Sequence, residues 1–131
     1  MIFKELTQED KLLLLTDLCG RMPFGVVCKD TYLNVTGTLS AIGLNYDMGV
    51  LDKDDGEDES VYIPNCKPYL FPLKSMTEEQ REDWYDNLTL KDRGIGVNVD
   101  WLNKHHFDYR GLIAKDLALD ATGLGIYDDE K

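Results

Sequence analysis

The residues best suited to chemistry stand together near the C-terminal end of the chain, between Asp100 and Gly111. Both histidines lie here, side by side and within a few residues of an aspartate, a tyrosine and an arginine. An imidazole, whose ordinary pKa is about 6.5, acts as a general base when a carboxylate orients it, and a guanidinium can hold an anion. The candidate cluster therefore comprises Trp101, Asn103, His105, His106, Asp108, Tyr109 and Arg110.

Three roles are open for the candidate cluster. In a structural role, its aromatic side chains are core and its polar side chains hydrogen-bond the segment to the rest of the fold. The second role is a binding surface, and the third is catalysis by a small metal-dependent hydrolase or nuclease that uses His105, His106 and Asp108. Against catalysis, the chain has no Gly-x-Ser-x-Gly, no cysteine beside a histidine and no Gly-x-x-x-x-Gly-Lys.

Adjacent histidines do not by themselves make a zinc site. On a regular helix His105 and His106 would point about 100° apart, whereas zinc-binding helices space two histidines by four on one face. A set made of Cys28, Cys66 and the two histidines would require distant segments to meet in the fold. We therefore assign no metal, cofactor or catalytic residue from the sequence.

An acidic run, 52–59, holds six carboxylates in eight positions. It does not match a helix-loop-helix calcium loop, because placing Gly56 at the sixth position puts Leu51 at the first and Lys53 at the third. We interpret the run as a solvated hairpin loop between a strand that ends at Leu51 and one that begins at Val61. A loose cation site and a contact for a basic partner are the alternatives.

The other side chains that could bind a partner or react are aromatic or carry sulfur. Phe71, Trp84 and Tyr85 are candidates for an exposed patch that binds a partner, although burial in the core is the commoner outcome for large aromatic residues. The three cysteines include no Cys-x-x-Cys pair, which is typical of reduced thiols that fill a core.

Charge and composition limit the partners. The 131 residues carry 14 Lys and Arg against 25 Asp and Glu, a formal net charge of −11, with 43% hydrophobic residues. This composition suits one domain with a core, and the charge argues against direct binding of nucleic acid or anionic membranes. A protein is the expected partner, in one version a basic surface that the chain occupies as a decoy. With no signal-peptide pattern and no apolar run of about 20 residues, a cytoplasmic location is expected.

The elements that position these groups begin with a helix in 1–23. Thr7 is the expected N-cap, and Gly20 and Pro23 are expected to end the helix. The helical spacing predicts a buried face made of Leu12, Leu15, Cys19 and Met22, extended by Leu14 and Leu18.

The pattern then changes to alternation, which predicts a β-meander and a proline-rich connector in 24–73. A turn is expected at Lys29–Asp30, and Pro64, Pro68 and Pro72 predict an irregular extended path because prolines do not suit a central strand. Strands are expected at 24–28, 33–41, 44–50 and 61–63. The residues expected on their inner faces include Gly37, Leu39, Ala41, Met48 and Val50.

Residues 74–131 are predicted to be helical up to an acidic tail, 128–130. Thr77 and Gln80 form a capping box for a helix that runs to about Leu88, followed by a loop over 89–99. Asp100 is then the expected N-cap of a helix from Trp101 to Arg110, with a short continuation through Leu119. On that helix Trp101, His105 and Tyr109 share one face.

Together these segments predict a single α+β domain over 1–131, with an N-terminal helix, a small antiparallel meander and C-terminal helices. Short strands with tight connections also suit a partly closed barrel of the SH3-like kind.

Three segments, 17–26, 67–79 and 100–113, together resemble a family of small uncharacterised proteins encoded by phages, prophages and mobile elements of gut bacteria. The most specific is the last, with the pattern Trp-Leu-Asn-x-His-His-x-Asp-Tyr-Arg-Gly-Leu-Ile. Members often carry Arg where this chain has Phe71 and Gly where it has Asp116. The resemblance implies a genomic setting without an activity. We expect a phage- or mobile-element-associated accessory protein that is not an enzyme and binds another macromolecule.

Overall fold

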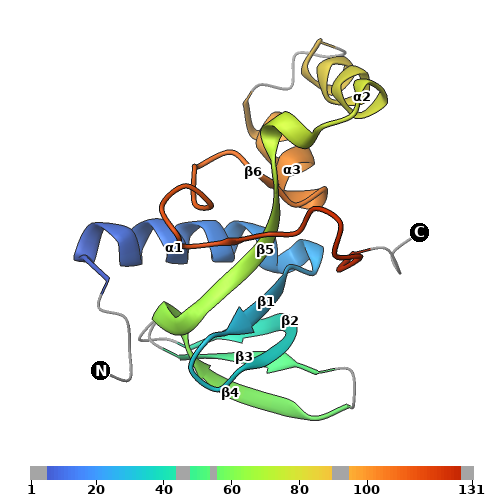
Figure 1. The fold of residues 1–131 in the computed structure, drawn as a ribbon. Helices are drawn as coiled ribbons and strands as arrows, with labels where there is room; N and C mark the ends of the chain where they lie inside the picture. The colour runs from blue at the N-terminus through green and yellow to red at the C-terminus, as the bar shows by residue number, and fades with distance from the viewer. Residues whose placement is uncertain (1–5, 44–47, 54–55, 90–94, 128–131) are drawn as a thin grey trace.

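The computed structural model describes residues 6–43, 48–53, 56–89 and 95–127, and these form an α+β fold with a mixed sheet (Figure 1). None of the helices in these ranges has the length and apolarity needed to span a bilayer. The helices are α1 (Gln8–Arg21), α2 (Glu78–Thr89) and α3 (Ile95–Lys104). The strands are β1 (Val27–Asp30), β2 (Val35–Ile42), β3 (Met48–Asp52), β4 (Asp58–Tyr62), β5 (Cys66–Pro72), β6 (Phe107–Asp108) and β7 (Leu119–Asp120).

Helix α1 begins where the sequence predicts, because the Thr7 hydroxyl accepts a hydrogen bond from the N–H of Asp10 at 3.0 Å. The predicted buried face is wrong at Leu12 and Cys19, whereas its extension by Leu14 and Leu18 is confirmed. Leu12 is 61% exposed and Cys19 is exposed, whereas the buried residues are Leu14, Asp17, Leu18 and Arg21. The buried pairs are spaced by four, so a single stripe of the helix faces the body; Leu13 and Leu15 are intermediate in exposure at its edges, and Leu12 lies on the opposite, exposed side.

Strands β1 to β4 form the predicted antiparallel meander, and the sheet is not closed into a barrel. The order across the sheet is β4-β3-β2-β1-β5-β6, with β7 also paired to β5. The turn expected at Lys29–Asp30 lies later, because β1 includes both residues. The Asp30 carboxylate then accepts hydrogen bonds from the N–H groups of Tyr32 and Leu33 at 2.9 and 2.8 Å and so organises the turn.

In two strands the prediction of which residues face the core is also wrong at particular positions. In β2, Leu39 is buried as expected, but the register shifts between Leu39 and Ala41 and leaves Ala41 exposed. In β3 the buried residues are Gly49 and Leu51, while Met48 is 42% exposed. A shift of one residue turns every following side chain to the opposite face of a sheet, and the alternating pattern alone does not reveal where a bulge lies.

Strand β5 joins the meander to the helical end, contrary to the irregular path predicted for the proline-rich connector. Thr31 donates its N–H to the carbonyl oxygen of Asn65 at 3.0 Å, and the register continues to the Cys28–Pro68 pair. Because hydrogen-bonded pairs alternate along an antiparallel ladder, the pair at Pro68 is one that exchanges no hydrogen bonds. The proline therefore removes nothing from the ladder with β1.

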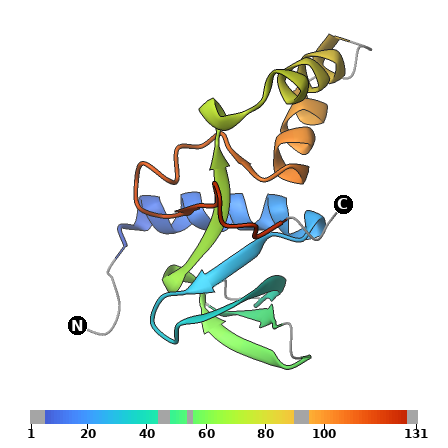
Figure 2. The same cartoon turned by 45° about the vertical axis from the view of Figure 1, so that its right-hand side comes forward.

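The region predicted to be helical, 74–131, follows the prediction only in part. The capping box is confirmed, since the Thr77 hydroxyl accepts from the N–H of Gln80 at 3.1 Å and the Gln80 side chain accepts from the N–H of Thr77 at 2.9 Å. The helix predicted from Trp101 to Arg110 and the loop predicted over 89–99 are both wrong in their bounds: α3 begins at Ile95 and already ends at Lys104. No helix follows it in the described residues to 127; the chain instead lays β6 and β7 alongside β5 in parallel (Figure 2).

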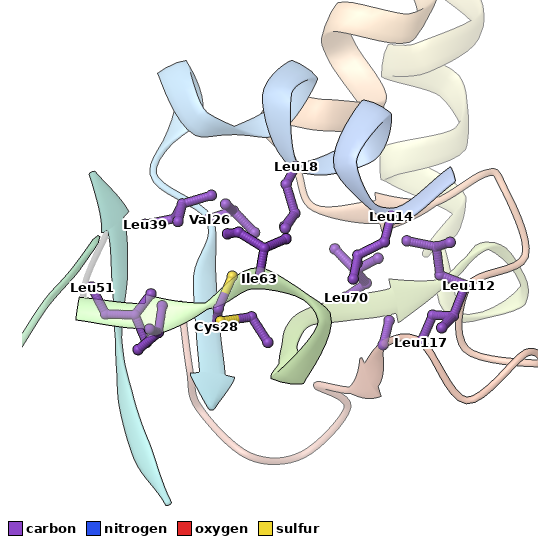
Figure 3. Close-up of a cluster of buried hydrophobic side chains, with 13 residues drawn as sticks. Leu14, Leu18, Val26, Cys28, Leu39, Leu51, Ile63, Leu70, Leu112 and Leu117 are labelled. Carbon is purple, nitrogen blue, oxygen red and sulfur yellow. The ribbon is translucent and has the colours of Figure 1, made fainter. Parts of the chain in front are cut away.

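The main core lies between α1 and the sheet, where Leu14 and Leu18 point from the helix toward the strands (Figure 3). It comprises Leu14, Leu18, Val26, Cys28, Leu39, Leu51, Val61, Ile63, Cys66, Leu70, Leu112, Leu117 and Ala118. A second group, the α3 cluster, comprises Met76, Trp101, Leu102 and Phe107, with Phe71, Trp84 and Tyr109 packed against it. Both groups include contacts with β5: Cys66 and Leu70 belong to the main core, and Phe71 packs against the α3 cluster.

Candidate functional site

The candidate cluster straddles the end of α3 and the strand that follows, so its members do not share a helix face as predicted. Trp101 and Asn103 lie on α3, and the histidines form the turn into β6. His106 has a φ of 64°, a left-handed conformation that reverses the direction of the chain. Its carbonyl oxygen then accepts the N–H of Phe71 at 2.8 Å, which fixes the start of β6 against β5.

His106 is 3% exposed, and its ring stacks on Tyr127 with the ring centres 3.6 Å apart and the planes 9° from parallel. Burial lowers the pKa of His106 to about 4, and the nearby charges of Arg21 and His105 act in the same direction. The imidazole is therefore neutral at pH 7. A buried, neutral, stacked ring suits a structural role better than proton transfer to a substrate.

His105 lies half-buried on the other side of the turn. Its ring packs on Trp101 with the centres 4.2 Å apart, and burial together with the Lys104 charge lowers its pKa. The Trp101 indole N–H donates to the Asp83 carboxylate at 2.8 Å, which ties α3 to α2. The two histidines thus contact different aromatic residues: His105 contacts Trp101 of α3, and His106 contacts Tyr127 near the C-terminal end of the described residues.

Asp108 uses both carboxylate oxygens inside the fold. One accepts the N–H of Leu112 and the other the N–H of Ile113, both at 2.9 Å. These bonds hold the turn that follows β6 and bring Leu112 into the main core. A carboxylate engaged in this way is a local organiser of the backbone, comparable to a helix cap.

Replacing Asp108 by asparagine is expected to lower the free energy of unfolding by about 1–3 kcal/mol, because the amide NH₂ faces one of the two N–H donors, of Leu112 (buried) or of Ile113 (part-buried), and leaves it unsatisfied. Urea unfolding followed by circular dichroism measures the change. Asp120→Asn is the matched control: Asp120 is exposed, and the oxygen that accepts the N–H of Thr122 at 2.9 Å is one that an amide retains. Equal losses in the two variants would contradict the role given to Asp108.

Arg110, Tyr109 and Asn103 belong to a polar network with a buried centre, whose other members the sequence did not indicate. The network centres on Asp17 of α1, which accepts from Arg21 Nε at 2.7 Å and from Arg110 Nε at 3.2 Å. Arg110 also donates to the Tyr109 hydroxyl at 3.2 Å, and that hydroxyl donates to Asn103 Oδ1 at 2.9 Å. Both guanidinium groups lie over the ring of Tyr109, that of Arg21 5.2 Å and that of Arg110 4.9 Å from the ring centre.

Asp17 and Arg21 are both fully buried, and Arg21 Nη2 donates to the carbonyl oxygen of Phe107 at 2.6 Å. The network therefore ties α1 to β6 and to the end of α3. The only sequence signal was an acid and a base spaced by four on a leucine-rich helix, a pattern that is usually a solvated surface pair.

The described part of the chain brings no three His, Cys, Asp or Glu side chains close enough to share a metal ion. The hypothetical zinc set is thus not assembled there. Cys28 and Cys66 lie in the main core, where burial raises the pKa of both thiols, that of Cys66 to about 12. Both thiols are protonated at neutral pH, which leaves them poor nucleophiles and poor metal ligands.

The other candidate functional residues from the sequence, the acidic run and the aromatic residues, lie in different parts of the structure. The acidic run forms a hairpin in which Asp52 pairs with Asp58, so its loop is shorter than predicted; Asp54, Asp55 and the tail 128–130 lie outside the described residues. Phe71 packs between Phe107 and Tyr127, with ring centres 6.0 and 6.1 Å away. Tyr85, in contrast, is 60% exposed on α2.

No family model, curated protein or solved structure matches the chain.

Proposed function

We propose that this chain is a non-enzymatic accessory protein that acts by binding another protein. The observation that supports the proposal is the outer face of α2, where Tyr85 is 60% exposed beside the half-buried Trp84. Aromatic residues on a surface are typical of the centre of protein interfaces, because they provide a large contact area with little loss of side-chain entropy. A phage or mobile-element setting is part of the proposal and is supported by the resemblance of three segments.

The hydrolase or nuclease alternative has weaker support. A general base needs a polar atom within hydrogen-bond reach of a substrate, and a metal site needs converging ligands. Both oxygens of Asp108 are occupied by backbone N–H groups, and His106 is 3% exposed and stacked on Tyr127. The candidate cluster is thus used to connect α1, α3 and β6.

Affinity capture tests the proposal. The purified chain is immobilised, exposed to a lysate of the cells that naturally express it, and the retained proteins are identified by mass spectrometry. We expect one specific partner to be retained by the unaltered chain and to be lost, by about tenfold or more, with Tyr85→Ala, since truncated aromatic anchors cost at least about 1–2 kcal/mol at interfaces.

Tyr32→Ala is the matched control, because Tyr32 is 50% exposed on the turn between β1 and β2, far from α2 in Figure 1. Retention by Tyr32→Ala should equal that of the unaltered chain. If the unaltered chain retains no specific partner, the proposed function is wrong.

A further inference from the structure

Helix α2 carries a hollow of about 390 Å³ on its outer side, lined by Glu78, Arg81, Glu82, Trp84 and Tyr85. We call it the α2 notch. The helix lies at the end of the molecule opposite the meander, as both views show (Figures 1 and 2). A partner can therefore approach the α2 notch without meeting the sheet.

The apolar part of the α2 notch is aromatic. Trp84 packs against the α3 cluster, which holds its ring in place, while Tyr85 is 60% exposed. Within the part of the chain that the structure describes, the buried indole nitrogen of Trp84 has no hydrogen-bond partner. The Trp84 ring is thus held by the α3 cluster, and the Tyr85 ring is accessible. The faces of aromatic rings carry π-electron density, which attracts cations.

The charged part of the α2 notch is acidic. Glu78 and Glu82 are spaced by four and line the same hollow, so their carboxylates are neighbours on the helix surface. Glu79 and Asp83 add to the negative charge of this helix, and Arg81 is its only base between 78 and 85. An anionic ligand would meet repulsion here. A purely apolar partner would remove carboxylates from water without compensation.

We infer that the α2 notch binds an arginine side chain from a basic segment of a partner protein. A guanidinium can stack on an aromatic ring while its N–H groups donate to carboxylates, so one side chain meets both parts of the α2 notch at once. The inference rests on the proposed function and names the chemistry of its partner. A second hollow, along α1, is lined by Glu9 and Asp10 and also by Arg110 and Lys115, so its mixed charge selects neither sign.

The test uses the full chain labelled with ¹⁵N and a seven-residue peptide that has a central arginine flanked by lysines. Titration is followed by NMR of backbone amides and of the two tryptophan indole N–H groups. We expect the Trp84 indole and the amides of 78–85 to shift on binding, while the Trp101 indole, bonded to Asp83, moves less. The same peptide with citrulline in place of arginine should bind about fivefold or more weakly, since the neutral analogue loses the ionic and cation–π attraction.

Two charge-matched double variants locate the binding. Glu78→Gln with Glu82→Gln should weaken the arginine peptide about fivefold or more, whereas Glu9→Gln with Asp10→Asn, which changes the net charge equally on α1, should change it less than about twofold. Circular dichroism confirms that each variant is folded. Equal weakening by the two pairs, or equal binding of the citrulline peptide, would overturn the inference.

The inference and the proposed function fail separately. If a specific partner is captured but neither its binding nor that of the peptide depends on Glu78 and Glu82, the protein binds through another face and only the inference is wrong. If the peptide binds at the α2 notch as expected, the inference stands on its own measurement, and capture then tests whether a natural partner uses it.

Discussion

Replacing Asp17 by asparagine is expected to lower the free energy of unfolding by about 3–5 kcal/mol, the range found when one partner of a buried ion pair is removed. Asp17 and Arg21 are both 0% exposed, and Asp17 also accepts from Arg110. The variant leaves the Arg21 guanidinium buried without a compensating negative charge, while a neutral amide offers only one acceptor to two arginines. Urea unfolding at pH 7, followed by circular dichroism and tryptophan fluorescence, measures the loss.

Asp116→Asn is the matched control for this prediction. Asp116 pairs with Lys67 at 2.9 Å, but its side chain is 67% exposed, so the pair is screened by water. Its φ of 62° suits asparagine as well as aspartate, so the backbone adds no cost. We expect a loss below about 1 kcal/mol. Similar losses for the two variants would show that burial does not strengthen the Asp17 pair.

The double variant Asp17→Leu with Arg21→Met separates charge from packing. Both charges are removed from the interior, and Arg110, whose side chain is 27% exposed, can be hydrated. Buried ion pairs replaced by apolar residues are often no less stable than the original, so the double variant should be more stable than Asp17→Asn alone. If the double variant is as unstable as Asp17→Asn, the loss of stability comes from altered side-chain packing and not from the unpaired charge.

Acidification from pH 7.5 to pH 5 is expected to cost about 2 kcal/mol of stability through His106 alone. The pKa of His106 is about 4 in the folded chain, because the ring is buried and faces Arg21 and His105, against an ordinary value of 6.5 when unfolded. Between these values the unfolded chain binds more protons than the folded one. Stability is therefore complete above pH 6.5 and falls as the pH drops through this window. Urea midpoints measured at several pH values test the slope.

His106→Asn is the informative variant for this pH effect. Asparagine tolerates the φ of 64° and does not titrate, so the slope between pH 5 and 6.5 should largely disappear. Loss of stacking on Tyr127 should lower stability at pH 7.5 by about 1 kcal/mol. His105 also has a lowered pKa, and His105→Asn, as control, should leave most of the slope in place. An unchanged slope in His106→Asn would contradict the assignment.

The sequence by itself determined the features that depend on a few neighbouring residues. The cap at Thr7, the box formed by Thr77 and Gln80, and the antiparallel hairpins were predicted correctly. In each case the donor, the acceptor and the chain that joins them lie within one turn or one hairpin. The α+β class followed from the same local signals, because the change of hydrophobic period separates helix from strand.

The tertiary structure alone decided which side chains are buried together. The sequence placed a helix start at Asp100, but α3 begins at Ile95 and ends at Lys104 because the following residues pair with β5, about 35 positions earlier in the chain. Likewise, Asp17 is buried only because Arg21 and Arg110 both reach it, and Arg110 lies 93 residues away. Such contacts leave no periodic signal in the sequence, since the free energy that fixes them comes from groups that meet only after the chain has folded.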